Sequence, residues 1–199
     1  MLTGMKDTAL VVVDMLYDFI DGTMACGHAE EAVAESLRFI DRMTSEKLEG
    51  PEVIQSRFPI LFVCDHHPAD HCSFKAQGGP WPPHCVQGTR GDEVHDSLKP
   101  YVSEEFTFYK GYKADKEQYS GFEGINEAGQ SLGDVLDTME IRRVYVCGIA
   151  TEFCVRQTSE DLKAAGYEVI VLRDAIGWVD PKGHEGALAA MEAEGIRLA

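Results

Sequence analysis

The sequence lacks a long apolar segment. No stretch reaches the roughly 18 apolar residues of a membrane-spanning helix, and the valine-rich run at 9–13 ends in Asp14. The first residues also lack the charged, apolar and small-residue regions that make up a secretory signal. We therefore expect a cytoplasmic protein that does not have a membrane as its partner.

Positive charge is also scarce. The chain of 199 residues has 18 lysines and arginines against 34 acidic residues, a formal net charge of −16. Because a phosphate backbone attracts clustered basic side chains, this balance argues against nucleic acid as a partner. The six cysteines form no Cys-x-x-Cys pair, which argues against a thiol-redox protein. In a reducing compartment they are core residues, metal ligands or a nucleophile.

Strand-like and helix-like segments alternate along the chain. Its length suits one domain, residues 1–199. The alternation predicts an α/β fold with three layers (αβα), a Rossmann-like and mostly parallel sheet with helices on both faces. The expected strands are 8–13, 58–64, 105–109, 144–148 and 168–172, and the expected helices are 30–47, 126–138, 152–165 and 181–194. Residues 65–91 form a long loop without periodicity, and such loops are usually functional.

Four chemically active side chains fall where predicted strands end. Asp14, Asp65 and Lys110 terminate three strands, and Cys154 follows a fourth at the start of a helix. Because ligands of open α/β sheets bind beyond the carboxyl ends of the strands, we expect these side chains to meet at one edge. This convergence predicts an active site.

Cys154 is the candidate nucleophile. With Thr151 as the expected N-cap, Cys154 lies in the first turn of a helix, where the helix dipole and Lys110 lower a thiol pKa. Asp14 could then take the thiol proton and later deliver it to a leaving group. The alternative is that Cys154 is a buried structural cysteine and that Asp14 and Lys110 form only an ion pair.

The long loop is rich in histidine. Alternation places Asp65 and His67 on the same side of an extended segment, His71 can return after a turn, and His84 comes from the far side of the loop. Imidazole with carboxylate suits zinc, iron or manganese. His66 is expected to face away from the metal. A closed structural zinc site, with Cys72 or Cys85 as a thiolate ligand, is an equally weighted alternative on ligand counting alone.

Six motifs in order carry a family resemblance over residues 10 to about 190. They are Val11-Val12-Val13-Asp14 followed by Asp18-Phe19, Asp65-His66-His67-Pro68 with His71, and the segments 79–89, 108–111, 119–124 and 148–155. On these residues the chain resembles the isochorismatase-like cysteine hydrolases and, within them, the nicotinamidases, also called pyrazinamidases.

The resemblance implies a role for each site residue. It implies a catalytic triad of Asp14, Lys110 and Cys154, and an oxyanion hole formed by the amides of Ala150 and Cys154, with a cis peptide bond before Ala150. The implied ligands of one divalent metal ion (zinc is expected, with iron or manganese as alternatives) are Asp65, His67, His71 and His84. The aromatic residues implied around the substrate ring are Phe19, Trp81 and Tyr119.

The implied activity is hydrolysis of nicotinamide, a small-molecule amide, to nicotinate and ammonia through a cysteine acyl-enzyme. The resemblance further implies that the metal anchors the substrate ring and that the reaction serves NAD salvage; a homo-oligomer is left open. Departures from the family pattern bear on substrate preference and metal identity, and they are Leu16, His66, Glu152 and Phe153. The alternatives are a relative that hydrolyses a carbamoyl or ureido amide and a non-catalytic, zinc-stabilised binding domain.

Overall fold

A single parallel sheet forms the centre of the molecule. The computed structural model describes residues 7–44 and 58–199, and within them six strands pair in the order β3-β2-β1-β4-β5-β6. All five pairings are parallel. The strands are β1 (Thr8–Val13), β2 (Ile60–Asp65), β3 (Thr107–Lys110), β4 (Arg143–Gly148), β5 (Glu168–Ile176) and β6 (Arg197–Leu198). The α/β fold predicted from the sequence is confirmed.

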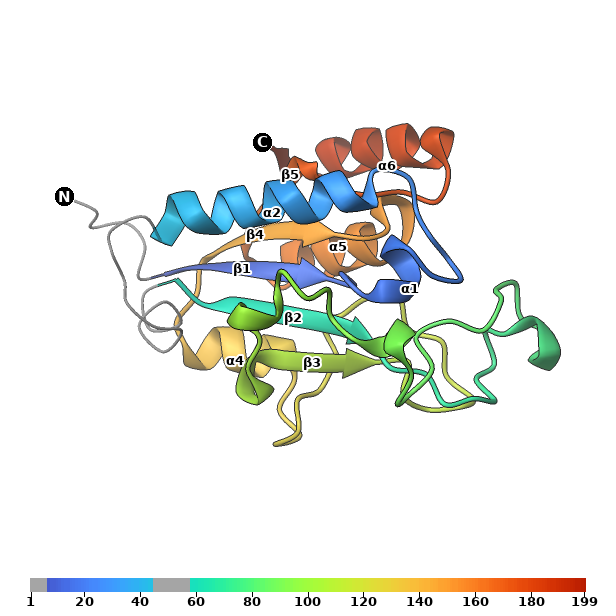
Figure 1. Ribbon diagram of the computed structural model, residues 1–199. Helices are drawn as coiled ribbons and strands as arrows, with labels where there is room; N and C mark the ends of the chain where they lie inside the picture. The colour runs from blue at the N-terminus through green and yellow to red at the C-terminus, as the bar shows by residue number, and fades with distance from the viewer. Residues whose placement is uncertain (1–6, 45–57) are drawn as a thin grey trace.

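Helices cover both faces of the sheet. Leu10 and Val12 of β1 pack in a cluster with α1 (Tyr17–Ile20) and α2 (Ala29–Thr44). Val11 and Val13 point to the other face, toward α4 (Leu132–Thr138), α5 (Arg156–Ala164) and α6 (Pro181–Ala193). Figure 1 shows α2 running along the length of the sheet. Because β1 is central and buried on both faces, its sequence is continuously apolar rather than alternating.

Several element bounds differ from the sequence prediction. Strand β5 continues to Ile176 rather than ending at 172, and β2 and β3 each begin two residues later than expected. Helix α4 begins at Leu132 rather than at 126, because Ser131 and Asp134 form a reciprocal capping box that starts the helix there. The helix expected over 152–165 begins as a π turn, Thr151–Val155, before α5. The short elements α1 and β6 were not predicted, since four and two residues cannot display a period. Residues 45–47 of the first expected helix lie outside the described residues.

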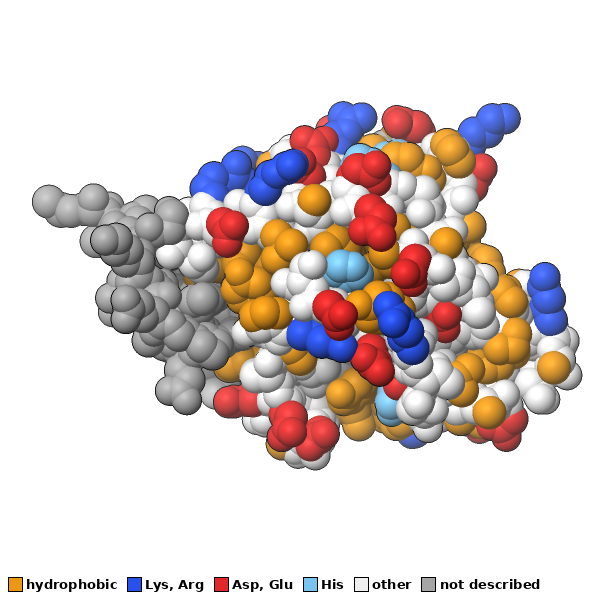
Figure 2. All heavy atoms as spheres, viewed as in Figure 1, with side chains coloured by type: hydrophobic (Ala, Val, Ile, Leu, Met, Phe, Trp, Pro, Cys, Tyr) orange, Lys and Arg blue, Asp and Glu red, His pale blue; other side chains and the backbone are white. Residues whose placement is uncertain are grey.

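The carboxyl ends of the central strands define one edge of the molecule. In Figure 1 the arrowheads of β1, β2 and β3 point toward the side on which α1 and the long loop lie. That loop contains only short 3₁₀ turns, Lys75–Gln77 and Arg90–Asp92. No helix in the described part of the chain is long and apolar enough to cross a bilayer. On the face drawn in Figure 2, basic and acidic side chains are interspersed, without a continuous basic patch.

The capping box at α4 gives a stability prediction. The Ser131 hydroxyl accepts from the Asp134 N–H at 3.1 Å and donates to Asp134 Oδ2 at 2.7 Å. We expect Ser131→Ala to lower the free energy of unfolding by about 1 kcal/mol, because it leaves helix N–H groups without a cap. Urea denaturation measures the change, with the exposed Ser97→Ala as a control. Equal effects of the two variants would contradict the boundary at Leu132.

Candidate active site

A buried lysine lies at the centre of the candidate site. Lys110 Nζ is 2.8 Å from Asp14 Oδ2, 2.5 Å from Asp65 Oδ1 and 3.3 Å from Cys154 Sγ. The side chains of Lys110 and Asp14 are fully buried. The register of the sheet places Asp65 opposite Lys110 on adjacent strands, so strand pairing delivers both groups to one point. The structure thus brings together the four strand-end residues that the sequence singled out.

Asp14 is fixed by its backbone and by its neighbours. Its φ of 48° is left-handed, and its N–H donates to Val63 O at 2.8 Å. The Asp14 Oδ1 atom accepts the N–H of Asp65 at 2.7 Å. Burial and the nearby Asp65 carboxylate raise the pKa of Asp14 to about 6, although Lys110 acts in the opposite direction. A carboxyl group with this pKa can both accept and return a proton near neutral pH.

The predicted lowering of the Cys154 pKa is wrong. The residue is only 5% exposed, and burial raises the pKa of its thiol well above the usual range. Lys110 lowers that pKa, but burial outweighs its effect, and the negative charges of Asp14 and Asp65 beside the sulfur raise the pKa further. The thiol is therefore protonated at rest, and a nucleophilic role for it would require a base. Asp14 is the adjacent group with a suitable pKa.

The turn that carries Cys154 is built differently from the expected capped helix. Ala150, not Thr151, is its N-cap residue, and the cap has no side-chain hydrogen bond. The Thr151 hydroxyl instead donates to Gly177 O at 2.8 Å. The peptide bond before Ala150 is cis, as the resemblance implied. Among the hydrogen bonds of the described residues, none uses the Ala150 N–H, which leaves it free to serve an oxyanion.

Three of the four expected metal ligands form one buried group. A carboxylate oxygen of Asp65 and ring nitrogens of His67 and His84 all lie within 4.8 Å of one another. His67 Nδ1 is 2.9 Å from Gly111 O, and His84 Nδ1 is 2.8 Å from Pro82 O. Each backbone carbonyl fixes a tautomer with the proton on Nδ1, so both Nε2 atoms are left for a metal. This donor set fits a zinc-type ion.

His71 lies beside this group but not within it. Its ring centroid is 4.1 Å from that of His67, whereas its Nδ1 contacts Ser73 Oγ at 2.7 Å and its Nε2 contacts Lys116 O at 3.1 Å. Its role as a fourth ligand stays a prediction. His66 is turned toward Asp92, at 2.9 Å, as expected for a residue that faces away from the metal.

The alternative with a thiolate ligand has no geometric support. Within residues 7–44 and 58–199, two groups could hold a metal: Asp65 with His67 and His84, and Asp14 with Asp65 and Cys154. Neither group contains Cys72 or Cys85. All six cysteines are free, and Cys85 is completely buried. The described residues therefore favour the nitrogen and oxygen donors over a closed cysteine site.

A small, largely apolar pocket opens beside the cysteine and the metal group. The expected ring-binding residues line it together with others, and the full set is Phe19, Met24, Asp65, Trp81, His84, Tyr119, Ala150, Phe153, Cys154 and Val179. The Trp81 indole N–H donates to the Tyr119 hydroxyl at 3.0 Å, and both rings contact Phe153. The aromatic and apolar lining therefore suits a small, flat and mostly apolar ligand.

Three lining residues were missed as site residues from the sequence. Met24 and Val179 lie in connections without periodicity, and nothing in their local sequence marks them. Phe153 was noted only as a departure from the family pattern, although its place one residue before Cys154 is a signal. Its ring meets Trp81 edge-on, with centroids 5.2 Å apart, and so forms one wall of the pocket.

The sequence and the fold both match a known protein family. A family model described as the isochorismatase domain matches residues 8–199. The chain therefore belongs to the isochorismatase family.

Several similar proteins within that family are named nicotinamidases or pyrazinamidases. The chain is 36% identical to a nicotinamidase/pyrazinamidase of Mycobacterium tuberculosis, over 96% of this chain and 97% of the relative. A crystal structure of the pyrazinamidase of Pyrococcus horikoshii in complex with zinc has a TM-score of 0.81 and 36% identity, covering 97% of this chain and 98% of that one. A structure of PnC1 from L. infantum in complex with nicotinate has a TM-score of 0.76 and 30% identity, covering 98% and 93%. The resemblance and the enzyme class expected from the sequence are confirmed.

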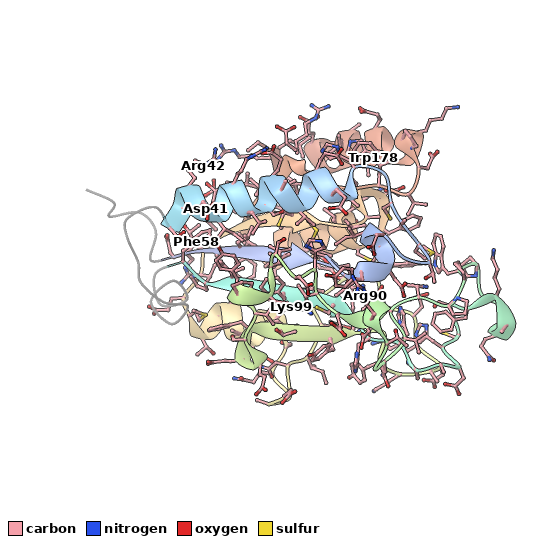
Figure 3. All side chains as sticks on the ribbon, viewed as in Figure 1. Asp41, Arg42, Phe58, Arg90, Lys99 and Trp178 are labelled. Carbon is pink, nitrogen blue, oxygen red and sulfur yellow. The ribbon has the colours of Figure 1, made fainter. Side chains whose placement is uncertain are left out.

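The buried position of Lys110 gives the second prediction. We expect Lys110→Met to lower the free energy of unfolding by about 3–5 kcal/mol, because it leaves two buried carboxylates without their cation. Lys99→Met is the matched control: Lys99, labelled in Figure 3, also contacts two carboxylates at 2.8 Å, but it is exposed. Urea denaturation should show a much smaller loss for the control. A similar loss in both variants would mean that Lys110 does not hold the buried charges together.

Proposed function

We propose that this protein is a nicotinamidase, which hydrolyses nicotinamide to nicotinate and ammonia with Cys154 as the nucleophile. The observation that carries the proposal is the contact of Lys110 Nζ with Asp14, Asp65 and Cys154 at the wall of an aromatic pocket. The names of the relatives, which are nicotinamidases and pyrazinamidases, support the substrate class.

The residues divide the reaction into two steps. In the first, Asp14 takes the thiol proton while Cys154 Sγ attacks the carboxamide carbon, and the N–H groups of Ala150 and Cys154 stabilise the oxyanion. Asp14 then delivers the proton to the departing ammonia, which leaves a thioester on Cys154. In the second step Asp14 removes a proton from water, water attacks the thioester, and the proton returns to the sulfur as nicotinate is released.

Lys110 has an electrostatic role in this scheme. Its ammonium lies within hydrogen-bond distance of both Asp14 and the sulfur, so a negative charge on either group is stabilised. The charge moves from carboxylate to sulfur and back during the reaction, and a fixed cation beside both groups needs no reorganisation when it does.

The metal group completes the proposal. Asp65, His67 and His84, with His71 as the predicted fourth ligand, would hold one divalent ion, for which zinc is the first candidate. When bound, such an ion supplies a Lewis acid that anchors a ring nitrogen and orients the carboxamide toward Cys154. The zinc complex of the P. horikoshii relative supports this choice of metal.

The proposal extends to organisation and context. We assign residues 1–199 to one domain in which loop 65–91 holds the metal, and the single sheet of the described residues supports this assignment. We place the reaction in the cytoplasm, as a step of NAD salvage that yields nicotinate. The free thiols of all six cysteines agree with a reducing compartment.

The assignment of the nucleophile gives the third prediction. Purified protein should release ammonia from nicotinamide, and Cys154→Ala should lower the rate by at least about 10³-fold, because the acyl-enzyme cannot form. Cys147→Ala, on the preceding strand and outside the pocket, is the control and should retain activity. Ammonia release measured for all three proteins tests this directly. Release that persists in Cys154→Ala would refute the nucleophile, and hydrolysis of a ureido compound instead of nicotinamide would favour the related amide hydrolases.

Metal removal gives the fourth prediction. His84→Ala should lower the zinc content and raise KM for nicotinamide while leaving the far-UV dichroism near normal, because the hydrophobic core lies in the sheet and its helices and not in the loop. His95→Ala, outside the metal group, is the control. Benzamide, which lacks the ring nitrogen, should be hydrolysed at least tenfold less efficiently than nicotinamide. A collapse of the dichroism on chelation would instead support a structural metal and the non-catalytic alternative.

A further inference from the structure

Asp18 is a buried carboxylate that neither the triad nor the metal group uses. It lies on α1, one residue before Phe19, and is 9% exposed. Its Oδ2 accepts the N–H of Cys85 at 2.7 Å, and its Oδ1 accepts the N–H of Thr23 at 3.1 Å. None of the ion pairs found among the described residues includes Asp18. The partners of the Asp18 carboxylate are therefore backbone N–H groups, which stabilise its negative charge as a cationic side chain would.

The residue that Asp18 binds is the junction between two metal-ligand candidates. Cys85 directly follows His84, and its C=O accepts the N–H of His67 at 2.9 Å. Its φ of 45° is left-handed, a conformation that a non-glycine residue adopts only when its surroundings enforce it. The N–H of Cys85 is hydrogen-bonded to Asp18, and its C=O is hydrogen-bonded to His67. The hydrogen bond to Asp18 therefore sets where the preceding residue, His84, lies relative to His67.

Further contacts fix α1 against the same segment. The Thr23 hydroxyl donates to Pro83 O at 2.9 Å, so the segment after α1 is hydrogen-bonded to the residue before His84. The guanidinium of Arg90, labelled in Figure 3, lies 4.1 Å from the ring centroid of Tyr17 in α1. Gly91 packs directly on Asp18: a Cβ there would lie 2.0 Å from Oδ2. Only a residue without a side chain allows the carboxylate to reach Cys85.

We propose that Asp18 is a positioning residue for the metal site, whose carboxylate holds the Cys85 backbone and so places His84 against His67 before a metal binds. We call the hydrogen bond between the Asp18 carboxylate and the Cys85 N–H the clamp. The inference deepens the proposed function and rests on it for the role of the metal, but the clamp itself is a property of the polypeptide. It requires a carboxylate, because both oxygens accept from N–H donors and an asparagine offers only one acceptor.

Asp18→Asn tests the clamp with almost no change of shape. In the metal-free protein we expect hydrogen exchange of the Cys85 and His67 amides to accelerate at least tenfold, with no change in β1. The dissociation constant for zinc, measured by competition with a chromophoric chelator, should rise by about 10–100-fold. At saturating zinc the kcat for nicotinamide should return toward that of the unmodified protein, because a positioning defect is compensated once the metal is bound.

Asp134→Asn is the matched control. Asp134 also accepts two hydrogen bonds through its carboxylate, but it lies on α4, so its loss should leave both the zinc dissociation constant and exchange at Cys85 unchanged. If Asp18→Asn does not fold, Gly91→Ala provides an independent route, because the new methyl group displaces the Asp18 carboxylate without removing it. It should produce the same two changes.

The outcomes separate the clamp from the proposed function. Unchanged exchange at Cys85 together with an unchanged zinc dissociation constant would overturn the role of Asp18. Acceleration that is equally large in β1 would overturn it as well, since it would show general loosening instead of local positioning. If the unmodified protein releases no ammonia from nicotinamide while the local effects appear, the proposed function fails and the clamp stands.

Discussion

The candidate site depends on the electrostatic interaction of the Lys110 ammonium with the acidic groups around it. Two carboxylates and a thiol converge at the carboxyl edge of the sheet, in a region almost without solvent. A buried charge without a partner costs several kcal/mol, and like charges this close cannot all be ionised without a cation between them. Lys110 contacts all three groups and is itself completely buried. The parallel pairing of β2 with β3 places it there, so the fold and the electrostatics of the site are linked through one strand register.

Asp65 connects this charge cluster to the metal group. Its Oδ1 is bonded to Lys110, and its Oδ2 lies 3.5 Å from His67 Nε2. Burial is the largest single effect on Asp65 and raises its pKa, but the combined effects of Lys110 and His67 outweigh it and hold the pKa well below its usual range. Asp65 thus stays ionised, whereas the pKa of Asp14 is raised to about 6. Two neighbouring carboxylates therefore differ in charge: Asp65 stays an anion, which suits a metal ligand, and Asp14 is able to exchange a proton near neutral pH.

The sequence predicts the fold and the meeting of strand-end residues well, because both follow from periodicity and from the geometry of parallel sheets. Apolar strands that end in Asp14, Asp65 and Lys110 leave few arrangements in which those ends do not meet. What depends on contacts between distant segments was not predictable. The start of α4 depends on a capping box, the pocket wall at Val179 depends on a connection with no pattern, and Asp18 is informative only when Cys85 lies against it.

The misjudged pKa of Cys154 shows the same limit in chemical terms. A helix start and a neighbouring lysine are visible in the sequence, and both favour a thiolate. The depth of burial is not visible in the sequence, and it is the largest effect on the pKa of Cys154. The carboxylates Asp14 and Asp65, which the strand ends do place at this edge, act in the same direction, and together these effects reverse the result. With the thiol protonated and Asp14 poised near neutrality, the resting site carries its proton on sulfur. In the proposed reaction, Asp14 would therefore take this proton only when an electrophilic carbon lies close enough for the sulfur to attack.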